Sequence, residues 1–275
     1  MRFASCRHAG RDFAAAIVDD VAIPLAGLTQ LGSDSLDRLP HEAPRAGADA
    51  VPLADVRLRP LVPRPGKIIC VGLNYLDHVG ETGRAIPEYP VLFTKFAEAL
   101  IGPSDPIVLP AESTQVDYEA ELAVVIGRAG RRIAAEDGLA HVAGYTIAND
   151  VTMRDFQYKT HQWLQGKAWE ASTPLGPWLV TPDEVGDPSA LELRLSIGDR
   201  VLQEASTAQM MFDVPALIAH ISTFVTLQPG DVILTGTPGG VGFRREPQVF
   251  LQPGDRVRVE ISGLGALENA VVAEA

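Results

Sequence analysis

Two glutamates stand two residues apart at the head of an apolar run, an arrangement typical of a site for a hard cation. Glu119 and Glu121 lead into residues 122–126, an aliphatic run that ends at Gly127 and predicts a buried strand. Because residues i and i+2 of a strand face the same side, both carboxylates should enter one space. Two anions held there repel each other, and Mg2+, Mn2+ or Ca2+ would relieve that repulsion. The alternative is a solvent-facing strand edge with two unrelated acids.

A third acid ends the next apolar pattern along the chain. Asp150 closes residues 141–150, which predict a second short strand, and functional side chains often lie where a rigid strand ends. Asp150 would complete a set of three carboxylate ligands, with water or substrate in the other positions. The competing interpretation makes Asp150 a turn or cap residue, since Asn149 precedes it and Thr152 follows it.

Cationic and amide side chains follow in the next segment. Arg154 and Gln157 lie in a dense polar patch, and Lys167 stands between Trp163 and Trp169. A lysine between two large apolar side chains should be partly desolvated, which tunes its charge and its interactions. We therefore expect Lys167 to be held in place rather than to move freely at the surface.

These residues belong to a series of blocks at residues 71–81, 93–95, 118–122, 149–155, 166–167 and 230–242. In order and composition, the blocks resemble those of the fumarylacetoacetate hydrolase family, which includes fumarylacetoacetase, acylpyruvases and related diketo-acid enzymes. Each block is a weak signal alone, but their shared order makes chance agreement improbable. The resemblance covers residues 65–272, most of the chain.

The resemblance implies a divalent metal ion, Mg2+ or Mn2+, held by Glu119, Glu121 and Asp150. The ion would bind the 2-oxo-carboxylate end of a small diketo-acid substrate and act as a Lewis acid. Lys167 would be a catalytic cation beside the enolate that develops during the reaction.

Substrate-binding residues are predicted on both sides of this centre. Arg154 and Gln157 would orient the substrate carboxylate. Residues 235–240 look like a phosphate loop, but the segment lacks the Lys-Ser/Thr ending, and Pro238 removes one backbone donor. We interpret the segment as a carboxylate cradle built from backbone N–H groups and the Thr237 hydroxyl.

A candidate catalytic base lies upstream, in residues 73–84. His78 and Glu81 are three residues apart, so in a helical turn they share a face, and Glu81 can orient His78 or share a water with it. Gly72, Gly80 and Gly83 accompany them, and the resemblance implies a lid that orders over bound substrate. Without the resemblance, His78 would be interpreted as an exposed loop histidine.

The predicted reaction is hydrolysis of a C–C bond in an acylpyruvate such as fumarylpyruvate, giving pyruvate and a carboxylic acid. Many family members have Asp and Thr where this chain has Glu170 and Ala171, and the Ala171-Ser172 pair is closer to the acylpyruvase-like branch. An oxaloacetate decarboxylase and a 2-hydroxyhepta-2,4-diene-1,7-dioate isomerase remain alternatives on the same site. A non-catalytic binding protein should have lost a carboxylate, Lys167 or His78, and all are present.

Composition limits the partners of the protein. A net charge of −12 over 275 residues argues against nucleic acid and anionic membranes. No run approaches the ~20 apolar residues that span a bilayer. The only cysteines, Cys6 and Cys70, fit a reducing environment and predict a cytoplasmic protein. The resemblance adds the expectation of a homodimer.

A proline-rich stretch containing Pro60, Pro63 and Pro65 should be extended and linker-like. We therefore expect a small N-terminal α/β unit over residues 1–62 and a catalytic domain over residues 63–275. The larger unit alternates strand patterns with Pro and Gly turns, and its clearest helix covers residues 214–222, with Asp213 as N-cap. These patterns predict a mixed, β-rich α+β fold with a rolled or barrel-like sheet.

Overall fold

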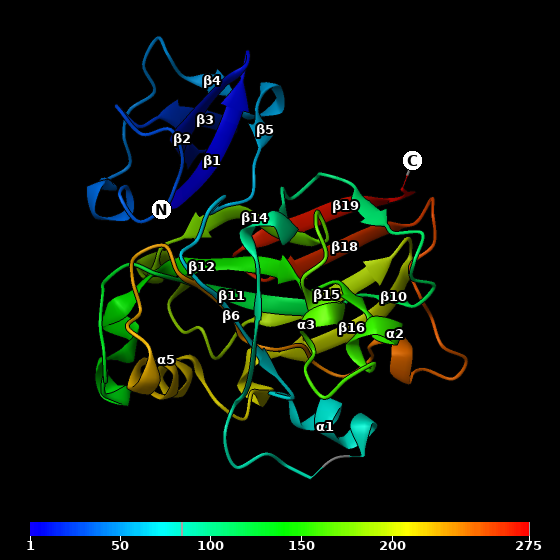
Figure 1. The fold of residues 1–275 in the computed structure, drawn as a ribbon. Helices are drawn as coiled ribbons and strands as arrows, with labels where there is room; N and C mark the ends of the chain where they lie inside the picture. The colour runs from blue at the N-terminus through cyan, green and yellow to red at the C-terminus, as the bar shows by residue number, and fades with distance from the viewer. Residues whose placement is uncertain (84, 275) are drawn as a thin grey trace.

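The computed structural model describes residues 1–83 and 85–274 and confirms a mixed, sheet-rich α+β fold (Figure 1). The main sheet contains, in spatial order, β4 (Val51–Pro52), β3 (Val21–Pro24), β2 (Arg11–Val18), β1 (Arg2–His8), β14 (Thr173–Val180), β12 (Val142–Asn149), β11 (Ala120–Ile126), β17 (Val232–Leu234), β6 (Ile68–Gly72) and β7 (Val91–Lys95), with β5 (Arg57–Leu58) beside β1 and β8 (Leu100–Ile101) beside β14. The second sheet contains β16 (Arg200–Ser206), β15 (Glu192–Ile197), β18 (Arg256–Ile261), β19 (Gly265–Ala273) and β9 (Ile107–Leu109). A short ladder joins β10 (Val116–Asp117) to β13 (Thr152–Met153).

The sequence patterns predicted a rolled or barrel-like sheet, and the main sheet of the structure is not closed into a barrel. Closure requires the two edge strands of a sheet to pair with each other. Within the described residues, β7 pairs with β6 and β4 pairs with β3, so the main sheet remains open at both edges.

The N-terminal unit differs from the α/β expectation, because residues 1–62 contain no α-helix. Its only helical segments are the single 3-10 turns η1 (Leu36–Arg38) and η2 (Leu53–Asp55). The connection over residues 32–50 contains Pro40 and Pro44, which lack the N–H donor that a helix needs, together with Gly32 and Gly47. This unit is therefore a small antiparallel sheet with an irregular connection.

The same unit continues the main sheet instead of standing apart from it. Arg2 pairs with Val180 and Phe3 pairs with Leu179, which joins β1 to β14. In Figure 1 the blue N-terminal strands extend away from the body of the protein at this junction. The division into domains at residues 62 and 63 stays a prediction.

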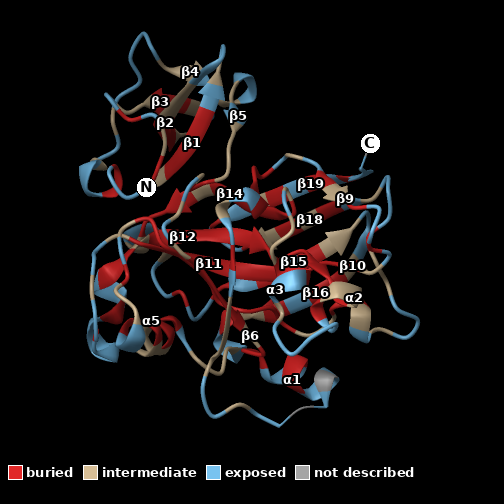
Figure 2. Ribbon diagram, in the orientation of Figure 1, coloured by how far each residue is buried: buried red, intermediate tan, exposed pale blue. Residues whose placement is uncertain are grey.

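Strand β11 lies at the centre of the protein and is buried on both faces (Figure 2). Leu122, Val124 and Ile126 pack into the core that β11 shares with the second sheet, whereas Ala123 and Val125 pack into the core that includes part of the N-terminal unit. Successive strand residues face opposite sides, so a strand covered on both sides must be apolar throughout. This explains the uninterrupted aliphatic run after Glu121.

Helices are few and short. They are α1 (Leu76–Thr82), α2 (Arg154–Gln157), α3 (Leu164–Lys167), α4 (Pro182–Val185) and α5 (Val214–Phe224), with 3-10 turns η3 (Ala97–Ala99), η4 (Ala135–His141), η5 (Thr207–Gln209) and η6 (Gly242–Arg244). The predicted helix after Asp213 is confirmed, since the Asp213 carboxylate accepts a hydrogen bond from the Ala216 backbone N–H at 2.9 Å. None of the described helices is long and apolar enough to cross a membrane.

Candidate active site

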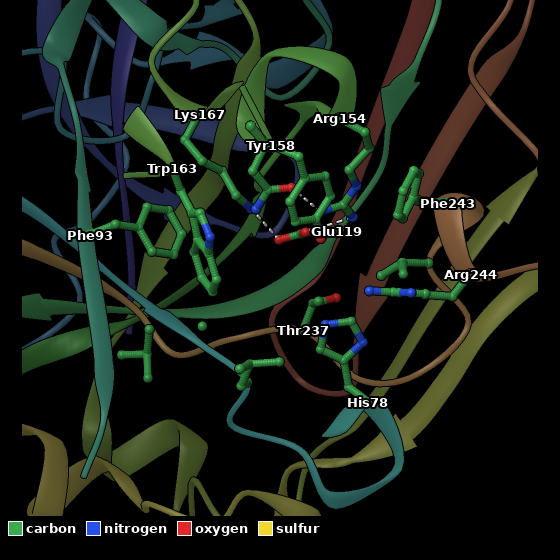
Figure 3. Close-up of a pocket in the computed structure, with 15 residues that line it drawn as sticks. His78, Phe93, Glu119, Arg154, Tyr158, Trp163, Lys167, Thr237, Phe243 and Arg244 are labelled. Carbon is green, nitrogen blue, oxygen red and sulfur yellow. Dashed lines mark hydrogen bonds and ion pairs between the residues drawn. The ribbon is translucent and has the colours of Figure 1, made fainter. Parts of the chain in front are cut away.

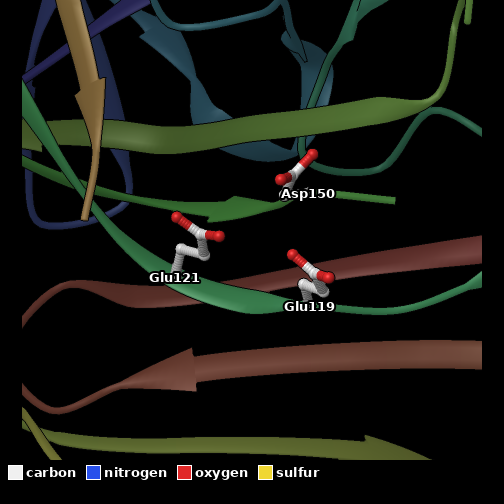
Figure 4. Close-up of side chains that lie close together, drawn as sticks. All are labelled: Glu119, Glu121 and Asp150. Carbon is white, nitrogen blue, oxygen red and sulfur yellow. The ribbon is translucent and has the colours of Figure 1, made fainter. Parts of the chain in front are cut away.

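The three predicted carboxylate ligands meet where β11 and β12 pair. Glu119 immediately precedes β11, Glu121 lies on it, and Asp150 immediately follows β12. The antiparallel register places Ala120 opposite Asn149, and the Asp150 N–H donates to the Glu119 carbonyl oxygen at 2.8 Å. One oxygen from each carboxylate lies within 4.8 Å of the others (Figure 4). Sheet register therefore gathers these acids, and their role as ligands stays a prediction.

Burial and crowding affect the acids of this cluster differently. Glu121 is buried, and burial, followed by the nearby charges of Asp150 and Glu119, raises its pKa well above the usual range. The Gly236 N–H donates to its Oε2 at 2.8 Å, which opposes part of that rise. Asp150 is equally buried, but Lys167 and Lys95 outweigh the effect of burial and lower its pKa.

Lys167 is the central cation of the cluster. Its Nζ donates to Glu119 Oε2 at 2.6 Å and to Asp150 Oδ2 at 2.7 Å. Burial by itself would lower the pKa of this ammonium group, but the two carboxylates outweigh burial and the pKa is raised. The tryptophan-flanked lysine of the sequence is thus buried and charged.

Lys95, at the end of β7, is a residue to which the sequence patterns assigned no role. Its Nζ donates to Asp150 Oδ1 at 2.7 Å and to the Val151 carbonyl oxygen at 3.2 Å. The one sequence signal was its place at the end of the block at residues 93–95. Only the pairing of distant strands brings this lysine to Asp150.

Arg154 is occupied by protein partners. Its Nε donates to Asp117 Oδ2 at 2.8 Å and its Nη1 to Gln157 Oε1 at 3.0 Å. Its Nη2 lies 2.7 Å from Glu119 Oε1, but without the angle of a hydrogen bond. Burial lowers the pKa of the guanidinium, and Asp117 and Glu119 more than compensate and raise it. Arg154 therefore positions Glu119, and substrate binding by Arg154 and Gln157 stays a prediction.

The cluster fits a divalent cation by its donor set and its charge. It contains the carboxylates Asp117, Glu119, Glu121 and Asp150 and the cations Lys95, Arg154 and Lys167. Ionisation of every group leaves one negative charge in excess in a buried volume, which is unfavourable without a further cation. Carboxylate oxygens are the preferred ligands of hard divalent ions. The buried triad of Glu119, Glu121 and Asp150 could therefore hold such an ion.

Thr237 is positioned by a glutamine that sequence analysis missed. Gln203 donates from Nε2 to Thr237 Oγ1 at 2.8 Å and to the Pro238 carbonyl oxygen at 3.0 Å, while its Oε1 accepts from the Ala120 N–H at 3.0 Å. Because Thr237 accepts this bond, its hydroxyl hydrogen remains able to donate to a ligand. The geometry is compatible with the predicted carboxylate cradle.

His78 and Glu81 lie on α1, as the i, i+3 spacing predicted. His78 Nδ1 is 3.5 Å from Glu81 Oε2, and Nδ1 has no hydrogen-bond partner within the part of the chain that the structure describes. Glu81 Oε1 accepts from the Gly240 N–H at 2.7 Å, which ties α1 to the loop around Thr237. The predicted lid over residues 73–84 includes residue 84, which lies outside the described residues.

Most of the predicted side chains line a single cavity (Figure 3). Its predicted lining residues are His78, Glu119, Arg154, Gln157, Lys167 and Thr237. Sequence analysis missed Phe93, Tyr158, Phe243 and Arg244 as lining residues and assigned no site role to Trp163. Phe93 lies on β7, Tyr158 follows α2, and Phe243 and Arg244 lie on η6, so the fold brings these positions together from separate elements.

Comparison with known proteins identifies the family. Residues 67–272 match the family described as fumarylacetoacetate (FAA) hydrolase C-terminal. The chain belongs to the fumarylacetoacetate hydrolase family. The human protein named oxaloacetate tautomerase FAHD2A, mitochondrial, is 50% identical over 224 residues, which cover 81% of this chain and 71% of that protein. A Xenopus laevis protein named oxaloacetate tautomerase fahd2, mitochondrial, is 51% identical over 221 residues, covering 80% of this chain and 69% of the relative.

Solved structures agree with this membership. Fumarylacetoacetate hydrolase from psychrophilic Exiguobacterium antarcticum matches with a TM-score of 0.89 and 36% identity over 100% of both chains. A 2-hydroxyhepta-2,4-diene-1,7-dioate isomerase from Mycobacterium marinum matches with a TM-score of 0.82 and 36% identity over 100% of this chain and 99% of that one. The protein is therefore an enzyme of a family whose members are named for different reactions.

The comparisons overturn the predicted cytoplasmic location. The human and Xenopus laevis relatives are both named mitochondrial. The prediction used Cys6 and Cys70, which are both buried and unpaired. Unpaired cysteines report a reducing environment, and such an environment is not unique to the cytoplasm.

Proposed function

We propose that this enzyme interconverts the keto and enol forms of oxaloacetate with the help of a divalent ion, Mg2+ or Mn2+. The observation that supports it is that the buried cation Lys167 and the histidine His78, which come from α3 and α1, line one cavity beside a carboxylate triad. Relatives that are half identical over most of the chain are named oxaloacetate tautomerases, which supports the choice of substrate.

Keto–enol conversion breaks a C–H bond at carbon 3 and forms an O–H bond at the carbon 2 oxygen. The reaction needs a base near carbon 3 and positive charge near the developing oxyanion. Because His78 Nδ1 faces Glu81, the neutral ring with its proton on Nδ1 presents Nε2 as the base. Nε2 would take the proton from carbon 3 and return it to the carbon 2 oxygen.

Other residues of the cavity would hold the substrate in the reactive orientation. A bound divalent ion would supply Lewis-acid charge to the 2-oxo-carboxylate group. Lys167, fixed by Glu119 and Asp150, would add positive charge next to the same oxygens. Thr237 would donate its hydroxyl hydrogen to the substrate carboxylate.

Hydrolysis of an acylpyruvate such as fumarylpyruvate is a second candidate function. The contact between His78 and Glu81 favours it, because a carboxylate-oriented histidine can activate a water molecule. The similar structure from Exiguobacterium antarcticum is named fumarylacetoacetate hydrolase. Decarboxylation of oxaloacetate and isomerisation of 2-hydroxyhepta-2,4-diene-1,7-dioate would use the same enolate chemistry.

One assay separates these reactions. The ultraviolet absorbance of enol-oxaloacetate is followed with Mg2+ and with EDTA, while pyruvate and CO2 are measured in parallel, and an acylpyruvate panel is run beside it. Accelerated, Mg2+-dependent loss of enol without pyruvate release supports the tautomerase. Release of pyruvate and an acid from an acylpyruvate, without acceleration on oxaloacetate, would replace it with the hydrolase. Glu121→Gln, which removes a proposed ligand, should abolish the Mg2+ dependence, and Glu170→Gln, at an exposed acid, is its matched control.

We also propose that the protein is a homodimer that acts on small molecules, not on nucleic acid or membranes. The net charge of −12 supports the exclusion of polyanionic partners. A native mass near twice 29.4 kDa is expected in sedimentation measurements. A monodisperse species of 29.4 kDa would contradict the dimer.

A further inference from the structure

Arg244 is a cation of the cavity that the chemistry above does not use. It lies at the end of η6, and Figure 3 shows its guanidinium extending toward Thr237 and His78. Within residues 1–83 and 85–274, its guanidinium forms no salt bridge with a carboxylate, and it lies 5.2 Å from the centroid of the Phe243 ring. The cavity therefore contains guanidinium donors that no acid of the described chain satisfies.

The other arginines near the cavity are occupied. Arg154 is bound to protein acceptors, as described above. Arg245 donates from Nε to the Gly240 carbonyl oxygen at 3.0 Å and to the Tyr118 hydroxyl at 3.2 Å. Arg244 thus differs from its neighbour in sequence, because it is exposed and retains its donors.

The backbone that carries Arg244 is fixed to the carboxylate cluster. The buried Asp117 accepts from the Gly242 N–H at 2.8 Å and from the Phe243 N–H at 3.0 Å. The same carboxylate accepts from Arg154 Nε at 2.8 Å, and Arg154 in turn contacts Glu119. One buried acid therefore sets the distance between η6 and the triad, while the Arg244 side chain extends into the cavity.

The cavity wall next to Arg244 is aromatic, because the Phe243 ring centroid lies 5.2 Å from the guanidinium carbon and 5.3 Å from the Tyr158 ring centroid. A substrate held by one end at the triad would place its carbon chain along such a wall. A guanidinium group presents paired N–H donors that match the two oxygens of a carboxylate. The residues of the cavity thus fit a ligand with an anionic group at each end.

We propose that Arg244 is a specificity-determining residue that binds a second carboxylate, at the end of the substrate remote from the triad, so that the enzyme selects dicarboxylates. This inference rests on the proposed function in taking the 2-oxo-carboxylate end to the triad. Oxaloacetate has the required second carboxylate, and a 2-oxo monoacid of equal length does not.

The test compares R244Q with R244K and with R11Q, which removes an exposed charge in the N-terminal unit and matches the charge change. Tautomerisation is measured on oxaloacetate and on its 4-methyl ester, which keeps the 2-oxo-carboxylate end and has no charge at carbon 4. R244Q should raise KM for oxaloacetate about tenfold or more, with a smaller change in kcat and no change for the ester. R244K should fall between R244Q and the native enzyme, and R11Q should behave as the native enzyme.

An equal loss on both substrates, or an unchanged KM for oxaloacetate in R244Q, would overturn the proposal. A binding measurement, which needs no turnover, distinguishes failure of this proposal from failure of the proposed tautomerase function. Calorimetry measures the affinity of the Mg2+-loaded protein for oxaloacetate and for 2-oxobutanoate, a 2-oxo monoacid with the same number of carbon atoms. Preference for oxaloacetate that R244Q abolishes supports Arg244 even in a protein without tautomerase activity. Equal affinity of the native protein for both acids contradicts it.

Discussion

In the carboxylate cluster, Lys167 lies within 2.7 Å of two buried acids, whereas on α1 the contact between His78 and Glu81 is 3.5 Å long. The cluster is built on β11 and β12, in the middle of the main sheet. Helix α1 is a short segment whose Glu81 is one-third exposed. Groups that must bear charge in a dry interior need complete pairing, while a group that exchanges protons needs freedom to change its partners.

This comparison predicts that the cluster supports the fold as well as the site, and that α1 supports only the site. The strongest test is Lys167→Met, which keeps the length of the side chain and removes its charge. Glu119 and Asp150 would lose a buried partner, so the free energy of unfolding should fall by about 3–5 kcal/mol. Urea unfolding measures this change. Lys159→Met, at an exposed lysine, should have little effect, and equal stability of the two variants would contradict the comparison.

His78→Asn is expected to reduce activity and to leave stability nearly unchanged. The substitution removes the proposed base, whose contact with Glu81 is long. Activity should fall by about 100-fold or more, because general bases contribute on the order of 10² to 10⁴. Unfolding should stay within about 1 kcal/mol of the native value. Steady-state kinetics measure the activity, and urea unfolding measures the stability. His41→Asn is the matched control, and a large loss of stability in His78→Asn would show that α1 is structural after all.

The effect of Mg2+ on the free energy of unfolding distinguishes the carboxylate cluster from α1. At a Mg2+ concentration 100 times its Kd, binding should stabilise the folded protein by about 2.7 kcal/mol. Thermal unfolding with Mg2+ and with EDTA measures the difference. Glu121→Gln should abolish it and His78→Asn should retain it, because only the first removes a proposed ligand. A Mg2+ effect that survives Glu121→Gln would place the ion elsewhere.

The smallest change in stability is expected from breaking an exposed ion pair. Comparison with Lys167→Met shows how much burial raises the cost of breaking an ion pair. Arg258 Nη2 lies 2.7 Å from Glu260 Oε1, and both side chains are 42% exposed. The hydrogen bond from Arg258, which outweighs partial burial, lowers the pKa of Glu260. The stabilisation that this ion pair contributes is therefore present above the pKa that Glu260 has in the unfolded chain. It is lost as pH falls through the lower pKa of Glu260 in the folded protein. Glu260→Gln should cost less than about 1 kcal/mol at pH 7 and nothing near pH 3, as urea unfolding at both pH values will measure. A difference that persists at pH 3 would contradict this assignment.

Local patterns in the sequence determined the parts of the site that depend on strand period and helix period. Glu119 and Glu121 share a face because strand residues alternate, and the aliphatic run after them predicted a buried strand. His78 and Glu81 share a face because i and i+3 are neighbours on a helix. Asp213 predicted the start of α5, and a capping hydrogen bond is present there.

Only the tertiary structure decided which distant residues complete these pairs. Lys95 reaches Asp150 because β7 and β12 belong to one sheet, and Arg154 is occupied because Asp117 lies beside it. Arg244 enters the cavity from a turn with no motif of its own. Register, pairing and burial arise from the free energy of the whole packed chain, so residues far apart in sequence acquire their partners only when the sheets form.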